Sequence, residues 1–285
     1  MRESELILRD DGSIYHLALH PGDLATTIVT VGDQGRVPEV SKHFDKIEVI
    51  KSSREFLTHT GYIGNKRISC VSTGMGSDNI DIFMNEVDAL FNIDFDEKKV
   101  KEKPTSLTFI RIGTSGSIHP KIALGDLLVT EVAIGLEGLM LFYELGHPSQ
   151  MEKAWLDELK TVHLPVRPEV FVGSDVLRNK LCSSTNFIPG VTMTAGGFYA
   201  PQNRNLRASR KEGPWWDDLM RCSVHGMNIT NIEMETAALY GMAKILGHQA
   251  VSVNSILAHR LEGSFASHPQ KLVNEAIAKT LEVIL

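Results

Sequence analysis

Arg111 is the residue whose surroundings point most directly to chemistry. It lies inside the apolar run 108–112, and Gly113 and Thr114 follow it. Burying a guanidinium is costly unless an anion pairs with it, and its fork of N–H groups matches the oxygens of a phosphate. We therefore interpret Arg111 and Thr114 as an oxyanion site. A structural ion pair with a buried Asp or Glu is the alternative.

A second arginine, Arg36, ends the glycine-rich segment 32–36, which directly follows the apolar run 25–31. Glycines allow backbone N–H groups to approach an anion, and an arginine adds a charge that does not titrate near neutral pH. Gly32 and Arg36 are thus a second candidate for anion binding. An ordinary turn with a surface arginine is the alternative.

Two carboxylates bracket a methionine in Glu233-Met234-Glu235, at the start of the expected helix 234–246. Carboxylates in this place can stabilise the positive end of the helix dipole. A carboxylate that faces the neighbouring strand ends could instead accept hydrogen bonds from two hydroxyl groups of a sugar. The spacing alone leaves both interpretations open.

The segment 197–204 combines aromatic, amide and guanidinium groups. Phe198 and Tyr199 offer a stacking surface, Gln202 offers an amide, and Arg204 offers a fixed fork of donors. These groups suit a planar heterocycle, and a polar loop packed by Phe198 is the alternative.

Other catalytic and metal-binding signatures are incomplete. The segment 74–76 lacks the third glycine of a dinucleotide-binding motif, and Ser115 lacks the final glycine of a nucleophile elbow. His16 and His20 have the spacing of one helical face, but no third ligand lies nearby. The two histidines therefore do not predict a metal site.

These groups must be positioned by elements that alternate along the chain. Apolar, β-branched runs predict strands over 25–31, 66–72, 107–112, 127–134, 191–194 and 250–257. Apolar spacings of three and four predict helices over 80–91, 151–162, 234–246 and 269–285, with a strand-to-helix region at 170–179. Gly247 is the expected stop of the third helix, and Ser267 and Gln270 have capping-box spacing before the last. The alternation predicts an α/β fold, and the charged stretch 94–103 predicts a solvated loop.

Composition limits the function classes. The chain has 285 residues, 42% of them hydrophobic, which fits a globular protein. Its 29 Lys and Arg against 35 Asp and Glu give a net charge of −6, which argues against nucleic acid and anionic membrane as partners. No apolar run approaches a membrane helix, and no secretion signal is visible. Three widely spaced cysteines indicate a cytoplasmic location, and the lack of a linker predicts one domain over residues 1–285.

Together these residues resemble the nucleoside phosphorylase superfamily, and most closely its uridine phosphorylase branch. The matching segments follow the family order along nearly the whole chain: 15–17, 32–36, 53–56, 72–76, 111–114, 125–129, 198–204 and 233–235. The resemblance implies a single α/β domain with a central mixed, barrel-like sheet flanked by helices. It also implies homodimers that share active sites and commonly assemble into hexamers.

The resemblance further implies an enzyme that cleaves uridine reversibly to uracil and ribose 1-phosphate. Phosphate is a co-substrate and no cofactor is required, and some members hold K⁺ between subunits. Purine nucleoside phosphorylases and water-using nucleosidases of the superfamily are alternatives, as is a non-catalytic nucleoside-binding protein. Three arginines, Arg36, Arg54 and Arg111, argue against a nucleosidase, and Arg111 with Thr114 and Glu235 argues against a non-catalytic protein.

Site residues are carried over position by position. The phosphate-binding positions of the family fall on Gly32, Arg36, Arg54, Arg111 and Thr114. The ribose-binding positions fall on His16, Met234 and Glu235. The base-binding positions fall on Phe198, Gln202 and Arg204. The positions of a monovalent cation fall on Glu55, Ile68 and Ser72.

Four of these residues are expected to be catalytic: Arg111, Glu235, Gln202 and Arg204. His16 and Arg54 are expected to reach the site of the neighbouring subunit. The chain departs from the family at three places: Ser115 replaces a threonine, Ala200-Pro201 replaces Pro-Gly, and His259 with Arg260 lies near an Asp of the purine branch.

Overall fold

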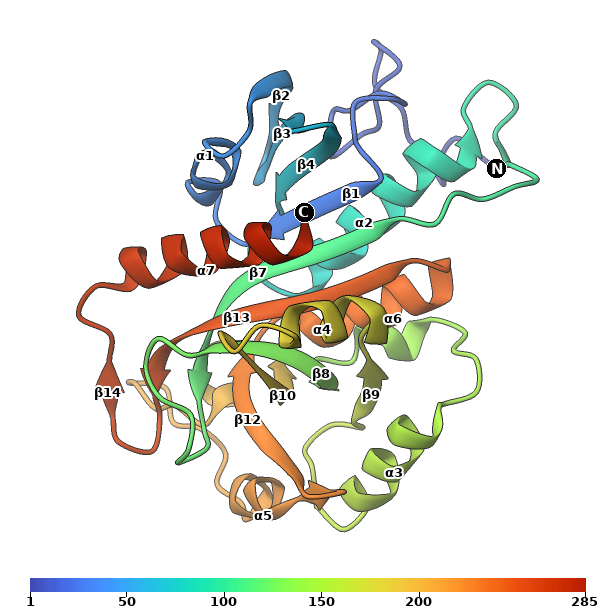
Figure 1. The fold of residues 1–285 in the computed structure, drawn as a ribbon. Helices are drawn as coiled ribbons and strands as arrows, with labels where there is room; N and C mark the ends of the chain where they lie inside the picture. Colours follow the sequence, from blue (N-terminus) through green and yellow to red (C-terminus); the bar gives the residue numbers. More distant parts are fainter.

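The computed structural model, which describes residues 1–285, has a mixed sheet flanked by helices (Figure 1). The strands are β1 (Thr27–Val31), β2 (Lys46–Ser53), β3 (Phe56–Ile63), β4 (Lys66–Ser72), β5 (Ile93–Asp94), β6 (Lys99–Val100), β7 (Thr108–Ser117), β8 (Leu127–Leu136), β9 (Glu169–Val172), β10 (Phe187–Ala195), β11 (Ser223–Val224), β12 (Met227–Glu233), β13 (Gln249–His259) and β14 (Ser264–Phe265). The helices are α1 (Arg36–Ser41), α2 (Ser77–Asn92), α3 (Gln150–Leu159), α4 (Asp175–Cys182), α5 (Trp215–Arg221), α6 (Thr236–Leu246) and α7 (Pro269–Ile284). Two 3₁₀ turns are η1 (Leu139–Phe142) and η2 (Ala200–Gln202).

One half of the sheet closes on itself. The strand order is β11-β12-β10-β8-β13-β7-β1-β4-β3-β2, and β12 also pairs with β7. The strands β12, β10, β8, β13 and β7 therefore form a closed ring, while β1, β4, β3 and β2 extend from it as an open sheet. This confirms the expected α/β fold with a barrel-like mixed sheet.

The core lies on both faces of the sheet because successive residues of an inner strand point to opposite faces. Ile28 of β1 packs in a cluster with α2 and α6, whereas Val29 packs in a cluster with α1, α4 and α7. A third cluster places Trp155 of α3 and Leu219 of α5 against the barrel. The helix α7 lies along β7 and β13 (Figure 1). None of the helices is both long enough and apolar enough to cross a membrane.

The predicted strands and helices are present, most of them with shifted ends, but seven strands (β2, β3, β5, β6, β11, β12 and β14) and two helices (α1 and α5) were not predicted. The hairpin β2–β3 fills residues 46–63, and β12 occupies residues 227–233, directly before the predicted helix 234–246. Because β12 ends at Glu233, α6 begins at Thr236 rather than at residue 234. Its predicted stop is confirmed, since Gly247 adopts a φ of 76° at the C-cap.

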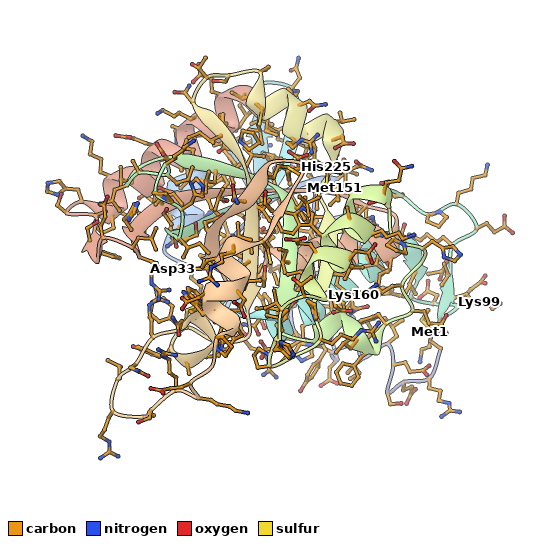
Figure 2. The ribbon with its side chains drawn as sticks, turned by 90° about the horizontal axis from the view of Figure 1, so that it is seen from below. Met1, Asp33, Lys99, Met151, Lys160 and His225 are labelled. Atoms are coloured by element: carbon orange, nitrogen blue, oxygen red, sulfur yellow. The ribbon has the colours of Figure 1, made fainter.

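Two local predictions were wrong, and one possible arrangement is not adopted. The stretch 94–103 contains the small hairpin β5–β6 rather than only loop, and the N-terminal amine donates to the carbonyl oxygen of Lys98 at 2.8 Å. Met1 and Lys99 accordingly lie on the same side of the molecule (Figure 2). His16 and His20 do not share a helix, because Ala18 between them has a φ of 54°. No capping box precedes α7, since its N-cap is His268 and no side chain caps it.

Candidate active site

Arg111 lies at the centre of a buried polar cluster. Its Nη2 hydrogen-bonds the carboxylate of Glu235 and lies 3.1 Å from Oε2 of Glu233, and its Nη1 donates to Oδ1 of Asn254 at 3.1 Å. Burial opposes the charge, but the two carboxylates hold the pKa of Arg111 above its usual value. The ion pair that the sequence left as an alternative therefore exists, and its partners are the two glutamates of the 233–235 segment.

Gly113 allows this arrangement on a strand that runs farther than predicted. A Cβ atom at position 113 would overlap the guanidinium of Arg111, so glycine is required where the arginine side chain crosses its own strand. The strand β7 nevertheless continues to Ser117, because it pairs in parallel with β13 along its whole length. Thr114 thus lies on a strand rather than in a turn, where it is half-buried.

The two carboxylates have different partners, which resolves the open interpretation of the segment. Glu233 accepts hydrogen bonds from the backbone N–H groups of Glu235 and Thr236, where α6 begins. It also accepts from Oγ1 of Thr194 at 2.6 Å. Glu235 instead accepts from the backbone N–H of Gly76 at 2.7 Å and from Arg111. Glu233 therefore stabilises the helix start, and Glu235 faces the neighbouring strand ends.

Burial raises the pKa of Glu235, Arg111 opposes that rise, and the Glu233 carboxylate adds to it. Met234 between them is half-buried. The carboxyl group of Glu235 is held by one backbone donor and one guanidinium, and it is the group of this segment that could accept from a bound hydroxyl.

The glycine-rich segment brings a second cation to this cluster. Arg36 is the first residue of α1 and is half-buried, and burial together with the nearby Arg111 charge lowers its pKa. A Cβ atom at Gly32 would lie 3.3 Å from the carbonyl oxygen of Gly74, so the two glycine-containing turns approach closely. Two guanidinium groups that repel one another across a strand end form a site that favours an anion between them.

The segment 197–204 forms a second cluster around a buried amide. Gln202 is 2% exposed, and the Nη1 of Arg204 hydrogen-bonds its side-chain oxygen and the carbonyl oxygen of Phe198. The guanidinium of Arg204 lies 3.9 Å from the centre of the Phe198 ring. Burial, with the nearby charge of Arg260, lowers the pKa of Arg204 to about 10. We call this set, residues 198–204, the base loop.

Arg260 belongs to this cluster, a role the sequence analysis did not assign to it. Its Nη2 donates to the backbone carbonyl of Gln202 at 2.9 Å, and its Nη1 is buried without a protein partner. An arginine directly after the apolar strand β13 was the available signal. His259 is buried, and its Nδ1 accepts from the backbone N–H of Glu262 at 3.3 Å.

His16 and Arg54 lie apart from the buried cluster. Arg54, at the tip of the β2–β3 hairpin, is exposed, and its guanidinium lies 5.6 Å from the centre of the Tyr15 ring. The Nδ1 of His16 lies 2.6 Å from a carboxylate oxygen of Glu86. Neither side chain hydrogen-bonds Arg111 or any other predicted phosphate-, ribose- or base-binding residue of the chain.

The predicted cation residues are only partly brought together. Ser72 ends β4, and its Oγ donates to the backbone carbonyl of Glu55 at 2.6 Å. Ile68 is fully buried four residues earlier on the same strand. No group of three or more His, Cys, Asp or Glu side chains in the chain is arranged to hold a metal ion.

Comparison with known proteins decides the family. The sequence pattern of the phosphorylase superfamily matches residues 26–284. The chain belongs to the phosphorylase superfamily.

Its curated relatives include both uridine phosphorylases and a purine nucleoside phosphorylase. A uridine phosphorylase of Thermococcus kodakarensis is 30% identical over 265 residues, which cover 92% of this chain and 83% of the relative. A DeoD-type purine nucleoside phosphorylase of Hahella chejuensis is 25% identical, over 90% of this chain and 91% of the relative. A crystal structure of a Trypanosoma brucei nucleoside phosphorylase, described as showing uridine phosphorylase activity, has a TM-score of 0.82 at 25% identity and covers 97% of this chain and 99% of its own.

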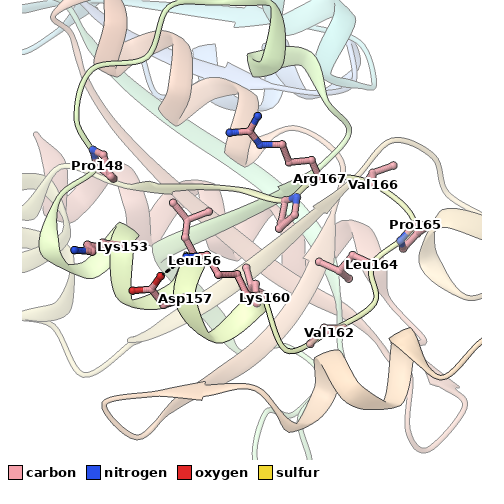
Figure 3. Close-up of a pocket in the computed structure, with 12 residues that line it drawn as sticks. Pro148, Lys153, Leu156, Asp157, Lys160, Val162, Leu164, Pro165, Val166 and Arg167 are labelled. Atoms are coloured by element: carbon pink, nitrogen blue, oxygen red, sulfur yellow. Dashed lines mark hydrogen bonds and ion pairs between the residues drawn. The ribbon is translucent and has the colours of Figure 1, made fainter.

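The chain also has a cavity of about 680 Å³, which lies away from the predicted site residues. It lies between α3 and the segment 162–168, and Figure 3 shows lining residues that include Leu156, Leu164, Pro148, Pro165, Lys153 and Arg167. None of the phosphate-, ribose- or base-binding residues predicted from the sequence lines it.

Glu137 is a buried carboxyl group beside the cluster, and it predicts a pH dependence of stability. Neither of its oxygens has a hydrogen-bond partner, and burial, with Glu233 and Glu169 nearby, raises its pKa from 4.5 to about 8. The folded chain keeps this proton between those pH values, whereas the unfolded chain loses it. Its contribution to stability is therefore fully present below pH 4.5 and is lost as pH rises through about 8.

We expect Glu137→Gln to remove this loss. The free energy of unfolding of the variant, relative to the wild type, should increase by a few kcal/mol between pH 5 and pH 9, since one pKa unit corresponds to about 1.4 kcal/mol. Urea unfolding of both proteins at the two pH values measures the difference. Glu144→Gln, at an exposed position, is the control and should show no such change. An identical pH dependence in Glu137→Gln and the wild type would contradict the burial of a neutral acid.

Proposed function

We propose that the chain catalyses reversible, phosphate-dependent cleavage of uridine to uracil and ribose 1-phosphate. The contact between Arg111 and Glu235 carries this proposal, because it joins a cation suited to phosphate and a carboxylate suited to sugar hydroxyls. The names of the relatives from Thermococcus kodakarensis and Trypanosoma brucei support the same substrate.

In the proposed reaction a phosphate oxygen forms a bond to C1′ of the ribose while the bond from C1′ to the base breaks. The electron pair of the broken bond leaves with uracil, and the sugar carries positive charge in the transition state. Arg36, Arg111, Gly32 and Thr114 hold the phosphate, and its negative charge also stabilises the sugar cation. Glu235 orients the ribose through its 2′- and 3′-hydroxyls, with Met234 against the sugar.

The base loop is proposed to bind uracil and to stabilise its anion. The amide of Gln202 matches the N3–H and O2 groups of uracil, and Arg204 donates to O4 while Phe198 packs against the ring. Arg260 supports the loop through the Gln202 carbonyl and adds positive charge. Placing fixed donors where negative charge develops is a large source of rate enhancement. The reaction is proposed to need no cofactor, with K⁺ at Glu55, Ile68 and Ser72 as a structural ion.

We further propose that the working unit is a homodimer in which each site takes His16 and Arg54 from the neighbour, with hexamers built from such dimers. The exposure of Arg54 and of three large apolar side chains supports this, since Tyr15 is 39%, Met75 77% and Phe142 89% exposed. Residues 1–285 are proposed to form one domain, and three free cysteines support a reducing, cytoplasmic location.

The function is tested by following cleavage of uridine, thymidine, inosine and adenosine with and without phosphate. Cleavage of uridine that requires phosphate supports the proposal. Efficient cleavage of inosine or adenosine would move the chain to the purine branch, which the Hahella relative represents. Cleavage without phosphate would indicate a nucleosidase, and binding without turnover would indicate a nucleoside-binding protein.

Site sharing predicts complementation between two inactive variants. A mixed dimer of an Arg54→Ala chain and an Arg111→Met chain contains one site with both residues intact, so it should recover close to half of the wild-type activity. Each variant alone should be strongly impaired. Mass-resolved mixed dimers, assayed for uridine phosphorolysis, provide the measurement. Mixed dimers no more active than the single variants would exclude sharing.

A further inference from the structure

Arg9 joins the two segments that carry His16 and Arg54. Its Nε donates to the backbone carbonyl of Tyr15 at 2.7 Å, and its Nη2 donates to Oγ of Ser53 at 2.6 Å. Tyr15 directly precedes His16, and Ser53 directly precedes Arg54. One guanidinium thus contacts the residue before each of the two side chains that are proposed to enter the neighbouring site.

Each of these segments is also held by a second side chain, Glu86 for residues 16–17 and Gln34 for Arg54. The carboxylate of Glu86 accepts from the backbone N–H groups of His16 and Leu17, at 3.0 and 2.9 Å, and contacts the His16 ring. The side-chain amide of Gln34 donates to the backbone carbonyl of Arg54 at 2.6 Å. The hydrogen bond from Arg9 to Ser53 is the only one between the N-terminal residues 1–17 and the β2–β3 hairpin.

Arg54 has a strained backbone conformation that neighbouring contacts must hold in place. Its φ is 55°, in the left-handed region, which costs a non-glycine residue about 1–2 kcal/mol. Such a conformation persists only where the surroundings hold it. Gln34 holds Arg54 itself through the Arg54 carbonyl, and Arg9 holds the preceding residue, Ser53. The two contacts therefore hold the backbone conformation that directs the Arg54 side chain toward Tyr15.

We propose that Arg9 is a positioning residue that keeps His16 and Arg54 at a fixed separation, so that one protomer presents both to its neighbour as a unit. This inference rests on the proposed sharing of sites. Phosphate and the ribose 5′-hydroxyl lie at opposite sides of the sugar, so two groups that contact them must enter with matched spacing. Misplacement by about 1 Å can lower a rate by about a hundredfold.

The test places Arg9→Ala in one chosen protomer of the mixed dimer described above. In that dimer the single intact site takes Arg111 from the Arg54→Ala chain and takes His16 and Arg54 from the Arg111→Met chain. Arg9→Ala in the Arg111→Met chain should therefore raise KM for both phosphate and uridine and lower kcat/KM about tenfold or more. The same substitution in the Arg54→Ala chain should leave kcat/KM unchanged. A general loss of stability would act equally in both placements.

Three further variants sharpen the result. Arg9→Lys in the donating chain should resemble Arg9→Ala, because one ammonium group cannot replace two N–H donors that point to different acceptors. Ser53→Ala should have a similar effect and should add nothing to Arg9→Ala, because both break the same hydrogen bond. Arg2→Ala, at an exposed position of the same N-terminal segment, is the control and should match the parent dimer.

The outcomes separate this inference from the function on which it rests. An inactive parent mixed dimer overturns site sharing and the inference with it, while phosphate-dependent cleavage by the wild type still stands. An active parent dimer that Arg9→Ala affects in neither placement, or equally in both, overturns only the role of Arg9.

Discussion

Replacing Arg111 with methionine is expected to lower kcat/KM for uridine phosphorolysis by at least two to three decades, the scale on which removing one fixed donor to a transition state acts. The guanidinium is proposed to hold phosphate, and it also pairs with both buried glutamates. Methionine fills much of the volume but leaves Glu233 and Glu235 without their cation. Breaking a buried ion pair from one side costs about 3–5 kcal/mol of stability.

Initial rates at varied phosphate concentration, together with denaturant unfolding, separate the two effects. Arg178→Met is the matched control, since Arg178 pairs with Glu131 at 3.0 Å and Asp175 at 2.9 Å on α4. It should lose some stability and keep its kcat/KM. A folded Arg111→Met variant with wild-type kcat/KM would remove Arg111 from the mechanism.

Selectivity for uridine over inosine is the second large effect that we expect, with a ratio of kcat/KM of at least two decades in the wild type. A site built to hydrogen-bond one edge of a substrate can reject an analogue without that edge by about four to five decades, because its own buried polar groups are left unpaired. Gln202 is such a buried group, and Arg204 holds its side-chain oxygen.

Gln202→Ala should therefore lower kcat/KM for uridine by about two decades and change that for inosine little. Gln270→Ala, on the exposed start of α7, is the control and should preserve both values. Wild-type turnover of inosine at or above that of uridine would transfer the chain to the purine branch. Equal losses for both substrates in Gln202→Ala would show that the residue only supports the loop.

The inner strands and helices could be predicted from the sequence because each depends on a local pattern of apolar residues. The strand β4 occupies residues 66–72 as predicted, since its β-branched run is bounded by polar residues on both sides. The hairpin β2–β3 was missed because β2 is exposed along most of its length and carries charges where an inner strand has apolar residues.

Other features depend on which groups meet in three dimensions. Nothing in Glu233-Met234-Glu235 shows that Glu233 accepts from the first backbone N–H group of α6 whereas Glu235 accepts from Gly76, because this difference depends on β12, whose strand character was not recognised. Gly113 looked like the end of a strand, but it provides the space for the Arg111 side chain. The position of Arg260 after an apolar strand is a weak signal, and its contact with the base loop depends on how that loop folds against the end of β13.

The half-closed sheet leaves one long strand, β2, with unpaired backbone groups along its outer side. Such an edge is a template on which a strand of another molecule can add, and this is a common first step of aggregation. Here Lys46 and Glu48 form an exposed ion pair at 3.4 Å, and Lys51 adds a third charge to the same strand. A strand of another molecule that paired with β2 would have to desolvate these charges, which is unfavourable. The charges therefore disfavour aggregation at this edge, although no helix covers it.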